Sequence, residues 1–168
     1  MAGALIVTAE LGLADFAWID ALRRTHYPPE RNQVPAHLTI FHALPPSAEV
    51  ELRGRLAQAA VRRTPPHATL TGLMDLGGGV AFRVVSPDLD RIREELAEEL
   101  HGLLGAQDSG GWRPHITIQN KVAPKTARAL KASLEAAFSP RPLMVAGLGL
   151  HRYLDGPWER ITVYPFRP

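Results

Sequence analysis

Two short stretches of the chain carry the same arrangement of histidine and threonine. His37 and Thr39 lie in the sequence HLTI, and His115 and Thr117 lie in the sequence HITI. Side chains alternate across a β-strand, so in each stretch the histidine and the threonine share one face, and the apolar residues share the other. We therefore expect two strands that each present an imidazole and a hydroxyl to the same surface.

Two histidines can act as acid and base in one turnover without a cofactor, because imidazole titrates near neutral pH. Displacement at phosphorus uses such a pair: one histidine takes a proton from the attacking water or hydroxyl, and the other gives a proton to the leaving oxygen. A threonine beside each histidine can donate a hydrogen bond to a non-bridging phosphate oxygen, which is worth about 3 kcal/mol in a transition state. The motifs therefore indicate phosphodiester chemistry, with His37, Thr39, His115 and Thr117 as catalytic residues.

These motifs need a framework of strands and helices, and the pattern of apolar residues predicts one. The GGG at 77–79 and the DGP at 155–157 predict turns between strands, and residues 105–114 predict a loop. The predicted strands comprise residues 4–10, 37–41, 67–76, 80–85, 115–119, 143–154 and 158–166, and the predicted helices comprise residues 14–25, 45–63, 86–104 and 123–138.

Each half of the chain thus runs from an HxTx strand to a helix and then to two hairpin strands, as a duplicated unit would. We expect an α+β fold with two lobes related by a pseudo-twofold axis, in which two antiparallel sheets face a central groove and the helices lie outside. His37 and His115 then meet in the groove. The length favours a single domain over residues 1–168, with the lobes intertwined around the two HxTx strands.

Composition argues against several other classes of protein. Hydrophobic residues make up 45% and charged residues 21% of the chain, which is typical of a soluble globular protein. No stretch is apolar for long enough to span a bilayer, and the N-terminus is not typical of a signal peptide. The absence of cysteine excludes disulfides and cysteine-based chemistry. A net charge of +2 does not indicate a protein that coats nucleic acid. A protein that binds only one end of a strand, however, does not need a strongly basic surface. We expect a cytoplasmic monomer that binds no membrane.

The two motifs resemble those of the two-histidine (2H) phosphoesterase superfamily and, within it, of the bacterial 2′-5′ RNA ligase-like group. VPAHLTIF resembles the first motif of that group, and WRPHITI resembles the second, including the proline before the histidine. The order of elements extends the resemblance over nearly the whole chain. The resemblance implies a bilobal α+β fold and four catalytic positions, His37, Thr39, His115 and Thr117.

The same resemblance implies hydrolysis of 2′,3′-cyclic phosphates at RNA ends or on small nucleotides, which leaves a 2′-phosphate. Some relatives join RNA ends through 2′-5′ linkages, the reverse reaction. The resemblance suggests His37 as the acid on the leaving oxygen and His115 as the base on water. We expect no cofactor and no metal.

Two other functions stay open. One is a 2H enzyme for a different phosphodiester, such as an ADP-ribose cyclic phosphate or an RNA 3′ end, and the other is a module that binds an RNA end or nucleotide without turnover. A zinc site is disfavoured because neither motif has carboxylate or cysteine ligands nearby and no HExxH occurs. The sequence also lacks the P-loop GxxxxGK[ST] and the GxSxG of serine hydrolases.

Three residues near the motifs are candidates for substrate binding. Phe41 shares the parity of His37, so its ring either stacks on a base or packs in the core. Gln119 and Lys121 share the face of His115 if the strand stays extended, at about 13 Å and about 20 Å from it. We expect both to line an outer groove for the rest of an RNA end, although Lys121 fits a solvated strand end equally well.

Tyr153 is a fourth candidate, as a stacking wall of the groove. It shares parity with His151 and with two glycines, which either leave room for a ligand or permit close packing of the sheet. Trp112 and Trp158 are expected to fill the core or to plug loops rather than to bind bases.

Overall fold

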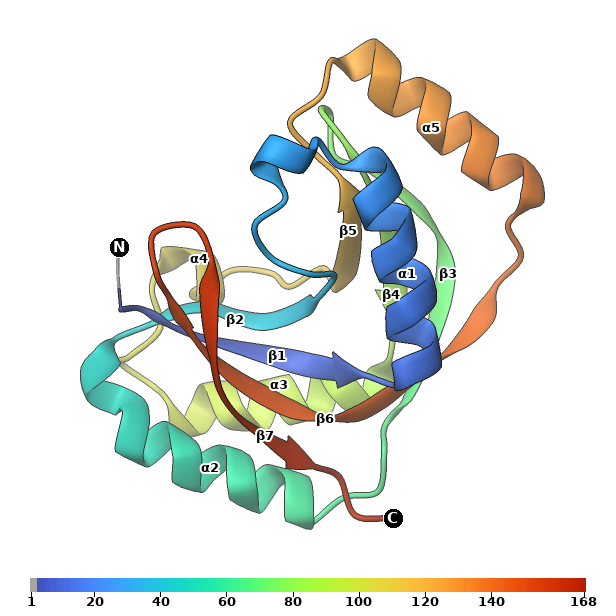
Figure 1. Ribbon diagram of the computed structural model, residues 1–168. Helices are drawn as coiled ribbons and strands as arrows, with labels where there is room; N and C mark the ends of the chain where they lie inside the picture. The colour runs from blue at the N-terminus through green and yellow to red at the C-terminus, as the bar shows by residue number, and fades with distance from the viewer. Residues whose placement is uncertain (1–2) are drawn as a thin grey trace.

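β-Strands joined by antiparallel pairing form the framework of the molecule (Figure 1). The computed structural model describes residues 3–168. Its strands are β1 (Leu5–Leu11), β2 (Leu38–Leu44), β3 (His67–Asp75), β4 (Val80–Val85), β5 (His115–Gln119), β6 (Arg141–Tyr153) and β7 (Trp158–Pro165). Its α-helices are α1 (Leu13–His26), α2 (Glu49–Val61), α3 (Pro87–Glu99), α4 (Ala106–Ser109) and α5 (Pro124–Ala137), with 3-10 turns η1 (Pro29–Arg31) and η2 (Pro46–Ala48). The predicted α+β class is confirmed.

The strands follow the order β2-β1-β6-β3-β4-β5, and β7 pairs with β6. Strand β6 is long enough to serve both halves: its C-terminal part pairs with β1, and its N-terminal part pairs with β3. The two expected sheets are therefore joined through β6 into one 7-stranded arrangement. The two HxTx strands, β2 and β5, stand at the two ends of this order, and they contact each other.

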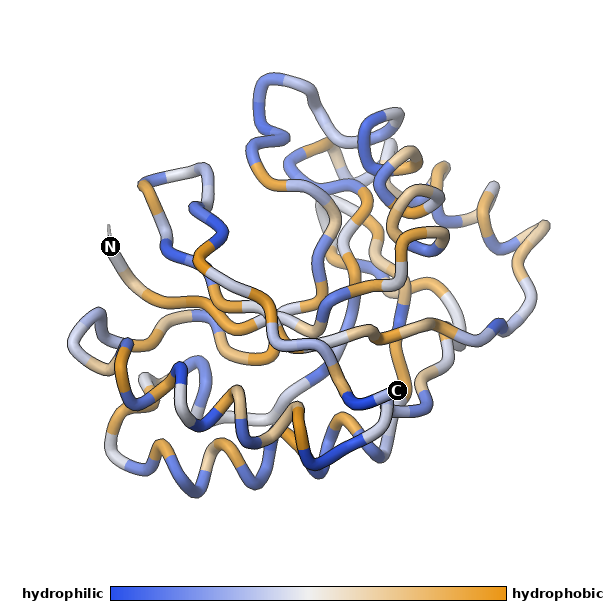
Figure 2. The backbone as a smooth tube through the Cα atoms, turned by 60° about the horizontal axis from the view of Figure 1, so that its bottom comes forward, coloured by the Kyte–Doolittle hydropathy of each residue, from blue (hydrophilic) through white to orange (hydrophobic). Residues whose placement is uncertain are grey.

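The helices cover the sheet with apolar stripes, as their periodicity predicts. Helix α2 packs on β6 and β7 and beside α3, and α3 also contacts β3. Hydrophobic and hydrophilic residues alternate along these two helices in Figure 2. On the other half, α1 packs on β5, and α5 packs on β3 and β4. Within residues 3–168, no helix has both the length and the apolar content to cross a membrane.

The loop predicted at residues 105–114 differs from the structure, because it contains the short helix α4. Asp108 of this helix is buried, with an exposed fraction of 2%, and its carboxylate accepts hydrogen bonds from the backbone N–H groups of His42 and Ala43 at 2.8 and 3.0 Å. Helix α4 therefore fixes the segment that directly follows the first motif. A single turn has too few residues for a periodic pattern, which is why the sequence did not predict it.

Candidate active site

Strands β2 and β5 show the predicted alternation over both HxTx motifs. Leu38 and Ile40 are fully buried, and Ile116 and Ile118 are fully buried in the second motif. The histidine and threonine of each motif are half-buried on the opposite face. The apolar residues thus anchor each strand in the core, and this anchoring turns the polar pair outward.

Both polar faces open on one cavity of about 510 Å³. His37, Thr39, His115 and Thr117 all line it, so the two motifs come together although they lie far apart in the sequence. The remaining lining residues are His42, Met74, Asp75, Leu76, Arg93, Gln107, Gly111, Trp112, Arg113 and Trp158. The cavity is therefore lined by three imidazoles, two of them from the motifs, and by two threonine hydroxyls and two arginines, which are groups that can take part in phosphoryl chemistry.

The two motif histidines are held by the same hydrogen bond. Nδ1 of His37 lies 2.8 Å from the carbonyl oxygen of Pro35, and Nδ1 of His115 lies 2.7 Å from the carbonyl oxygen of Arg113. A carbonyl oxygen only accepts hydrogen bonds, so Nδ1 carries the proton in both rings. Nε2 of each ring is then the atom that can accept or release a proton during a reaction.

Burial lowers the pKa of His37 from 6.5 to about 4. The hydrogen bond to Pro35 acts in the other direction, whereas the charges of Arg23, His151 and His115 lower the pKa further. His37 is consequently a neutral imidazole at pH 7, and its Nε2 has a free lone pair.

Each motif is also tied to the other half of the chain through the carbonyl group of its threonine. Arg23 of α1 donates from Nη1 to the carbonyl oxygen of Thr117 at 2.9 Å, and Trp112 donates from Nε1 to the carbonyl oxygen of Thr39 at 3.1 Å. β2 and β5 end the strand order, so one side of each lacks a strand partner in this order. Side chains of the opposite half satisfy these edge carbonyls and bring the two motifs into register.

A β-bulge follows the threonine in both motifs and changes the parity of the next residues. Thr39 and Phe41 pair with the consecutive residues Thr8 and Val7, so Ile40 is an extra residue. In the same way, Thr117 and Gln119 pair with consecutive residues of β4. An inserted residue breaks the alternation of side chains, so the parity argument fails beyond each threonine.

Because of the bulges, two of the residues proposed to bind substrate do not face the cavity. Phe41 has no exposed surface and lies in the core, the second of the two roles that the sequence left open. Gln119 is also buried, at 3% exposed, so it does not line an outer groove. Its Oε1 has no hydrogen-bond partner among the described residues. Neither side chain reaches the cavity that the motifs line.

The other two proposed contacts also lie outside the cavity. Lys121 is exposed, and its φ of 65° places it in a turn after β5, so the strand does not stay extended as the parity argument assumed. Tyr153 is half-buried and pairs across the β6–β7 ladder with Trp158. Trp158 occupies the position expected of Tyr153, because its ring lies 4.5 Å from the ring of His37. Parity within one strand cannot reveal a contact with the neighbouring strand, so the sequence missed Trp158.

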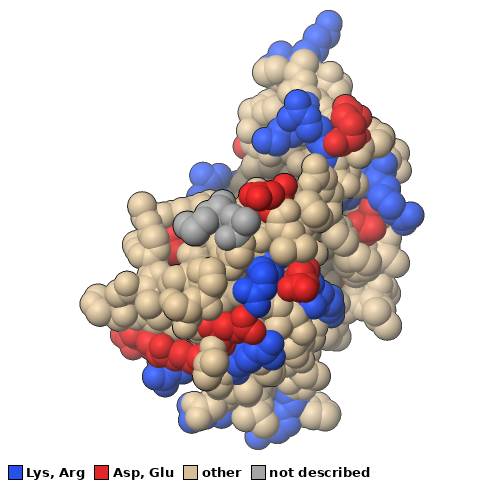
Figure 3. Space-filling model, turned by 60° about the vertical axis from the view of Figure 1, so that its left-hand side comes forward, with Lys and Arg blue, Asp and Glu red and all other residues tan. Residues whose placement is uncertain are grey.

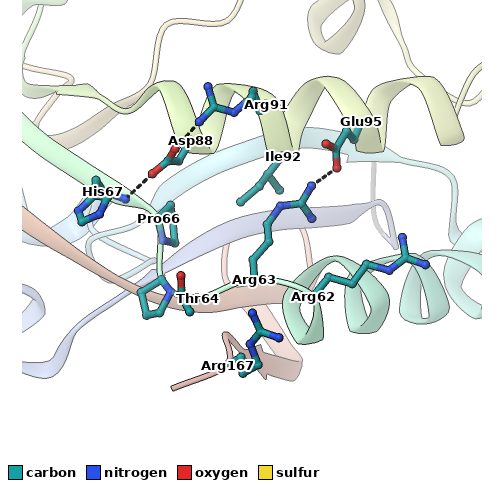
Figure 4. Close-up of a pocket in the computed structure, with 11 residues that line it drawn as sticks. Arg62, Arg63, Thr64, Pro66, His67, Asp88, Arg91, Ile92, Glu95 and Arg167 are labelled. Carbon is teal, nitrogen blue, oxygen red and sulfur yellow. Dashed lines mark hydrogen bonds and ion pairs between the residues drawn. The ribbon is translucent and has the colours of Figure 1, made fainter.

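A hollow at another place on the surface collects basic side chains but has neither motif. Arg62, Arg63, Arg91 and Arg167 line it, together with Asp88, Glu95 and His67 (Figure 4). Arg63 pairs with Glu95, and Arg91 pairs with Asp88. The face in Figure 3 likewise mixes basic and acidic side chains. The paired histidines therefore distinguish the cavity between β2 and β5 from these charged surfaces.

A family model described as the 2′-5′ RNA ligase superfamily matches residues 12–157. No curated protein matches the chain. Solved structures with the same fold include TT0787 of Thermus thermophilus, with a TM-score of 0.67 and 19% identity over 98% of both chains. They also include E. coli LigT in complex with 3′-AMP, with a TM-score of 0.61 and 21% identity over 100% of both chains. A protein described as a phosphoesterase has a TM-score of 0.58 and 22% identity over 99% of both chains.

Proposed function

We propose that this chain, which belongs to the 2′-5′ RNA ligase superfamily, opens 2′,3′-cyclic phosphates at RNA ends or on nucleotides and leaves a 2′-phosphate. One observation carries the proposal. His37 and His115 line the same cavity, and Nδ1 of each ring is hydrogen-bonded to a backbone carbonyl oxygen. The two Nε2 atoms are therefore left for proton transfer at one phosphate.

The reaction needs one proton removed and one proton delivered. Water attacks phosphorus while a neutral histidine takes its proton, and the bond from phosphorus to the 3′ oxygen breaks while a protonated histidine protonates that oxygen. The products are a 2′-phosphate and a 3′ hydroxyl. Thr39 and Thr117 donate hydrogen bonds to the non-bridging oxygens, where negative charge builds up in the transition state.

The environment of His37 favours it as the base of this reaction. Burial and nearby positive charges lower its pKa to about 4, so at pH 7 it is unprotonated and has no proton to donate to a leaving oxygen. His115 then protonates the leaving oxygen. This assignment is the reverse of the one that family resemblance suggested, in which His37 was the acid.

Structures of E. coli LigT support a nucleotide substrate, because that protein has been crystallised with 3′-AMP, with ATP and with NADP⁺. Each of these ligands is a nucleotide with phosphate groups. A 5′ hydroxyl of RNA can replace water as the nucleophile at the same phosphorus, with the 3′ oxygen again leaving, so a site that opens a cyclic phosphate with water can also form a 2′-5′ linkage. Hydrolysis is favoured in water, so the assay should detect it first.

The proposal is tested by incubating the protein with 2′,3′-cyclic AMP and identifying the product by chromatography. We expect 2′-AMP from the unchanged protein and no effect of EDTA. His37→Ala and His115→Ala should each lower turnover by at least ~100-fold, because each removes a proton-transfer group. Thr39→Ala and Thr117→Ala should each lower turnover by a smaller factor than the histidine variants.

His101→Ala is the matched control, since His101 is an exposed histidine that does not line the cavity. It should keep full activity. Circular dichroism should show that all variants are folded, because both motif histidines face a cavity and not the core. Near-native turnover by either motif variant would rule out the mechanism. Binding without turnover would favour a nucleotide-binding module, and activity that EDTA removes and zinc restores would favour a metal enzyme.

A further inference from the structure

A second cavity, of about 340 Å³, adjoins the cavity of the two motifs. His37 and Trp158 line both cavities, so the second one begins where the reacting phosphate would lie. Its walls are largely apolar and come from the C-terminal end of β1, from α1, from the loop before His37 and from β6 and β7. The remaining lining residues are Ala9, Glu10, Leu11, Leu13, Phe16, Val34, Pro35, Ala36, His151 and Arg160.

Polar groups of this cavity form one connected network. Thr8 donates from Oγ1 to Oε2 of Glu10 at 2.9 Å, and Oγ1 also lies 2.9 Å from Nε2 of His151. The only proton of the hydroxyl goes to Glu10, so Nε2 of His151 donates to Thr8. Nη2 of Arg160 binds the second carboxylate oxygen, Oε1 of Glu10, at 2.6 Å.

Gly149 leaves the space that this network occupies. A Cβ atom at this position would lie 2.6 Å from Oε2 of Glu10 and 2.6 Å from Oγ1 of Thr8. The sequence left two reasons for this glycine open, room for a ligand or close packing of the sheet. The structure shows a third: the glycine makes room for the side chains that hold Glu10.

The Glu10 carboxylate lines the cavity and can accept further hydrogen bonds. A carboxylate offers about four lone pairs, two on each oxygen. Thr8 uses one on Oε2 and Arg160 uses one on Oε1, which leaves one acceptor on each oxygen. Burial raises the pKa of Glu10, but the imidazole of His151, whose Nε2 lies 3.8 Å from Oε2, the hydrogen bond from Thr8 and the charge of Arg160 outweigh burial and lower it. Glu10 is therefore ionised at neutral pH and presents two adjacent acceptors beside the guanidinium of Arg160.

This arrangement is complementary to one nucleobase edge. The Watson–Crick edge of guanine presents two adjacent donors, N1–H and N2–H, followed by the acceptor O6. Adenine and cytosine each place an acceptor beside their amino donor, and uracil has one donor between two acceptors. Bases of single-stranded RNA are commonly read on this edge and stacked on aromatic rings. Here the indole of Trp158 supplies a ring beside His37.

We propose that this cavity binds the base of the substrate nucleotide and selects guanine, with Glu10 accepting from N1–H and N2–H and Arg160 donating to O6. The inference rests on the proposed function, because it places the cyclic phosphate of the same nucleotide between His37 and His115. Glu10 is thus a specificity-determining residue and not part of the proton transfer.

The experiment compares kcat/KM for the four 2′,3′-cyclic mononucleotides with the unchanged protein and with Glu10→Gln. The unchanged protein should prefer the guanine substrate by about 10-fold or more, because charged hydrogen bonds to a base contribute this much. Glu10→Gln should remove the preference by lowering kcat/KM for the guanine substrate about 10-fold, and it should leave the other three within about 2-fold. Glu159→Gln is the matched control, since Glu159 is an exposed carboxylate beside Arg160 that lines neither cavity.

Two outcomes overturn the inference while the proposed function stands: hydrolysis of all four substrates without a preference for guanine, or an equal loss on all four in Glu10→Gln. If the unchanged protein hydrolyses none of them, the proposed function fails, and binding of GMP and AMP by calorimetry tests the subsite alone. Tighter binding of GMP that Glu10→Gln abolishes supports the base site, and equal binding of the two nucleotides refutes it.

Discussion

At the scale of the residue, the environment of a histidine decides whether it acts as a proton acceptor or as a proton donor. His37 lies beside His115, His151 and Arg23, and burial with these positive charges lowers its pKa to about 4. A base must be unprotonated to act, so the acidic limb of kcat/KM should lie near pH 4. If His37 were the acid, activity would instead decline as the pH rises above that value.

The measurement is kcat/KM on 2′,3′-cyclic AMP between pH 3.5 and pH 9, a range of roughly five units that spans both limbs of a histidine pair. Circular dichroism at each pH is the control. The folded chain binds the His37 proton less readily than the unfolded chain, whose histidine has a pKa of 6.5, so stability falls as the pH drops from 6.5 towards 4. An acidic limb near pH 6.5 with a fully folded protein would contradict the assignment of His37 as the base.

At the scale of the element, the segment after the first motif depends on one buried carboxylate. Asp108 accepts hydrogen bonds from the backbone of His42 and Ala43, and its Oδ1 lies 3.1 Å from Nδ1 of His42. These hydrogen bonds hold the pKa of Asp108 below its usual range, although burial acts in the opposite direction. Arg93 adds a hydrogen bond from Nη2 to the carbonyl oxygen of Asp108 at 2.7 Å.

Asp108→Asn should therefore lower the free energy of unfolding by about 2 kcal/mol, because the amide NH₂ would face a backbone N–H donor and the charged hydrogen bonds would be lost. Urea denaturation followed by circular dichroism measures the change. Asp155→Asn is the control, since Asp155 is exposed in the β6–β7 turn with a φ of 60°, which asparagine tolerates. Equal stability of the two variants would show that α4 does not support β2.

The pair of β-bulges is the second feature at this scale. Each bulge lies directly after an HxTx threonine, in β2 and in β5. Before the bulge, alternation turns the histidine and the threonine toward the cavity. After it, Phe41 and Gln119 turn into the core. The bulge therefore ends the polar face after two residues and adds a buried residue that anchors each strand.

At the scale of the whole molecule, the cavity exists because β2 and β5, the strands at the two ends of the strand order, contact each other. Arg23 and Trp112 each cross from one half of the chain to a motif carbonyl of the other half. If the substrate is an RNA end, as proposed, the rest of the RNA has to leave this cavity over the surrounding surface. Lys121 lies in the turn between β5 and α5, two residues after the end of the second motif strand.

We propose that Lys121 contacts the phosphate backbone of an RNA substrate and not the reacting phosphate. Lys121→Ala should then raise KM for an oligonucleotide with a cyclic end, most strongly at low salt. The KM for a cyclic mononucleotide should not change. Lys125→Ala, in the first turn of α5, is a control for a general loss of positive charge. Equal effects on both substrates would place Lys121 at the reacting phosphate, and no effect on either would leave it as a solvated turn residue.

The sequence by itself determined the local part of this protein. Residues within one motif are neighbours on one strand, so alternation alone places His37 with Thr39 and His115 with Thr117 on a polar face, as the structure shows. The apolar stripes of α2 and α3 are local in the same sense, and they predicted both helices, although the observed α2 begins four residues later than predicted and α3 ends five residues earlier. The repeated motif also indicated the superfamily to which the chain belongs.

Only the tertiary structure decided which residues from different strands share a cavity. The bulges depend on pairing with β1 and β4. The contact of Trp158 with His37, that of Glu10 with Arg160 and that of Thr8 with His151 depend on the packing of strands β1, β6 and β7. No pattern within a single strand reports these contacts, because they join residues far apart in the chain. For the same reason, the low pKa of His37 follows from its folded surroundings and not from its motif, since burial and charge exist only once the two halves close on each other.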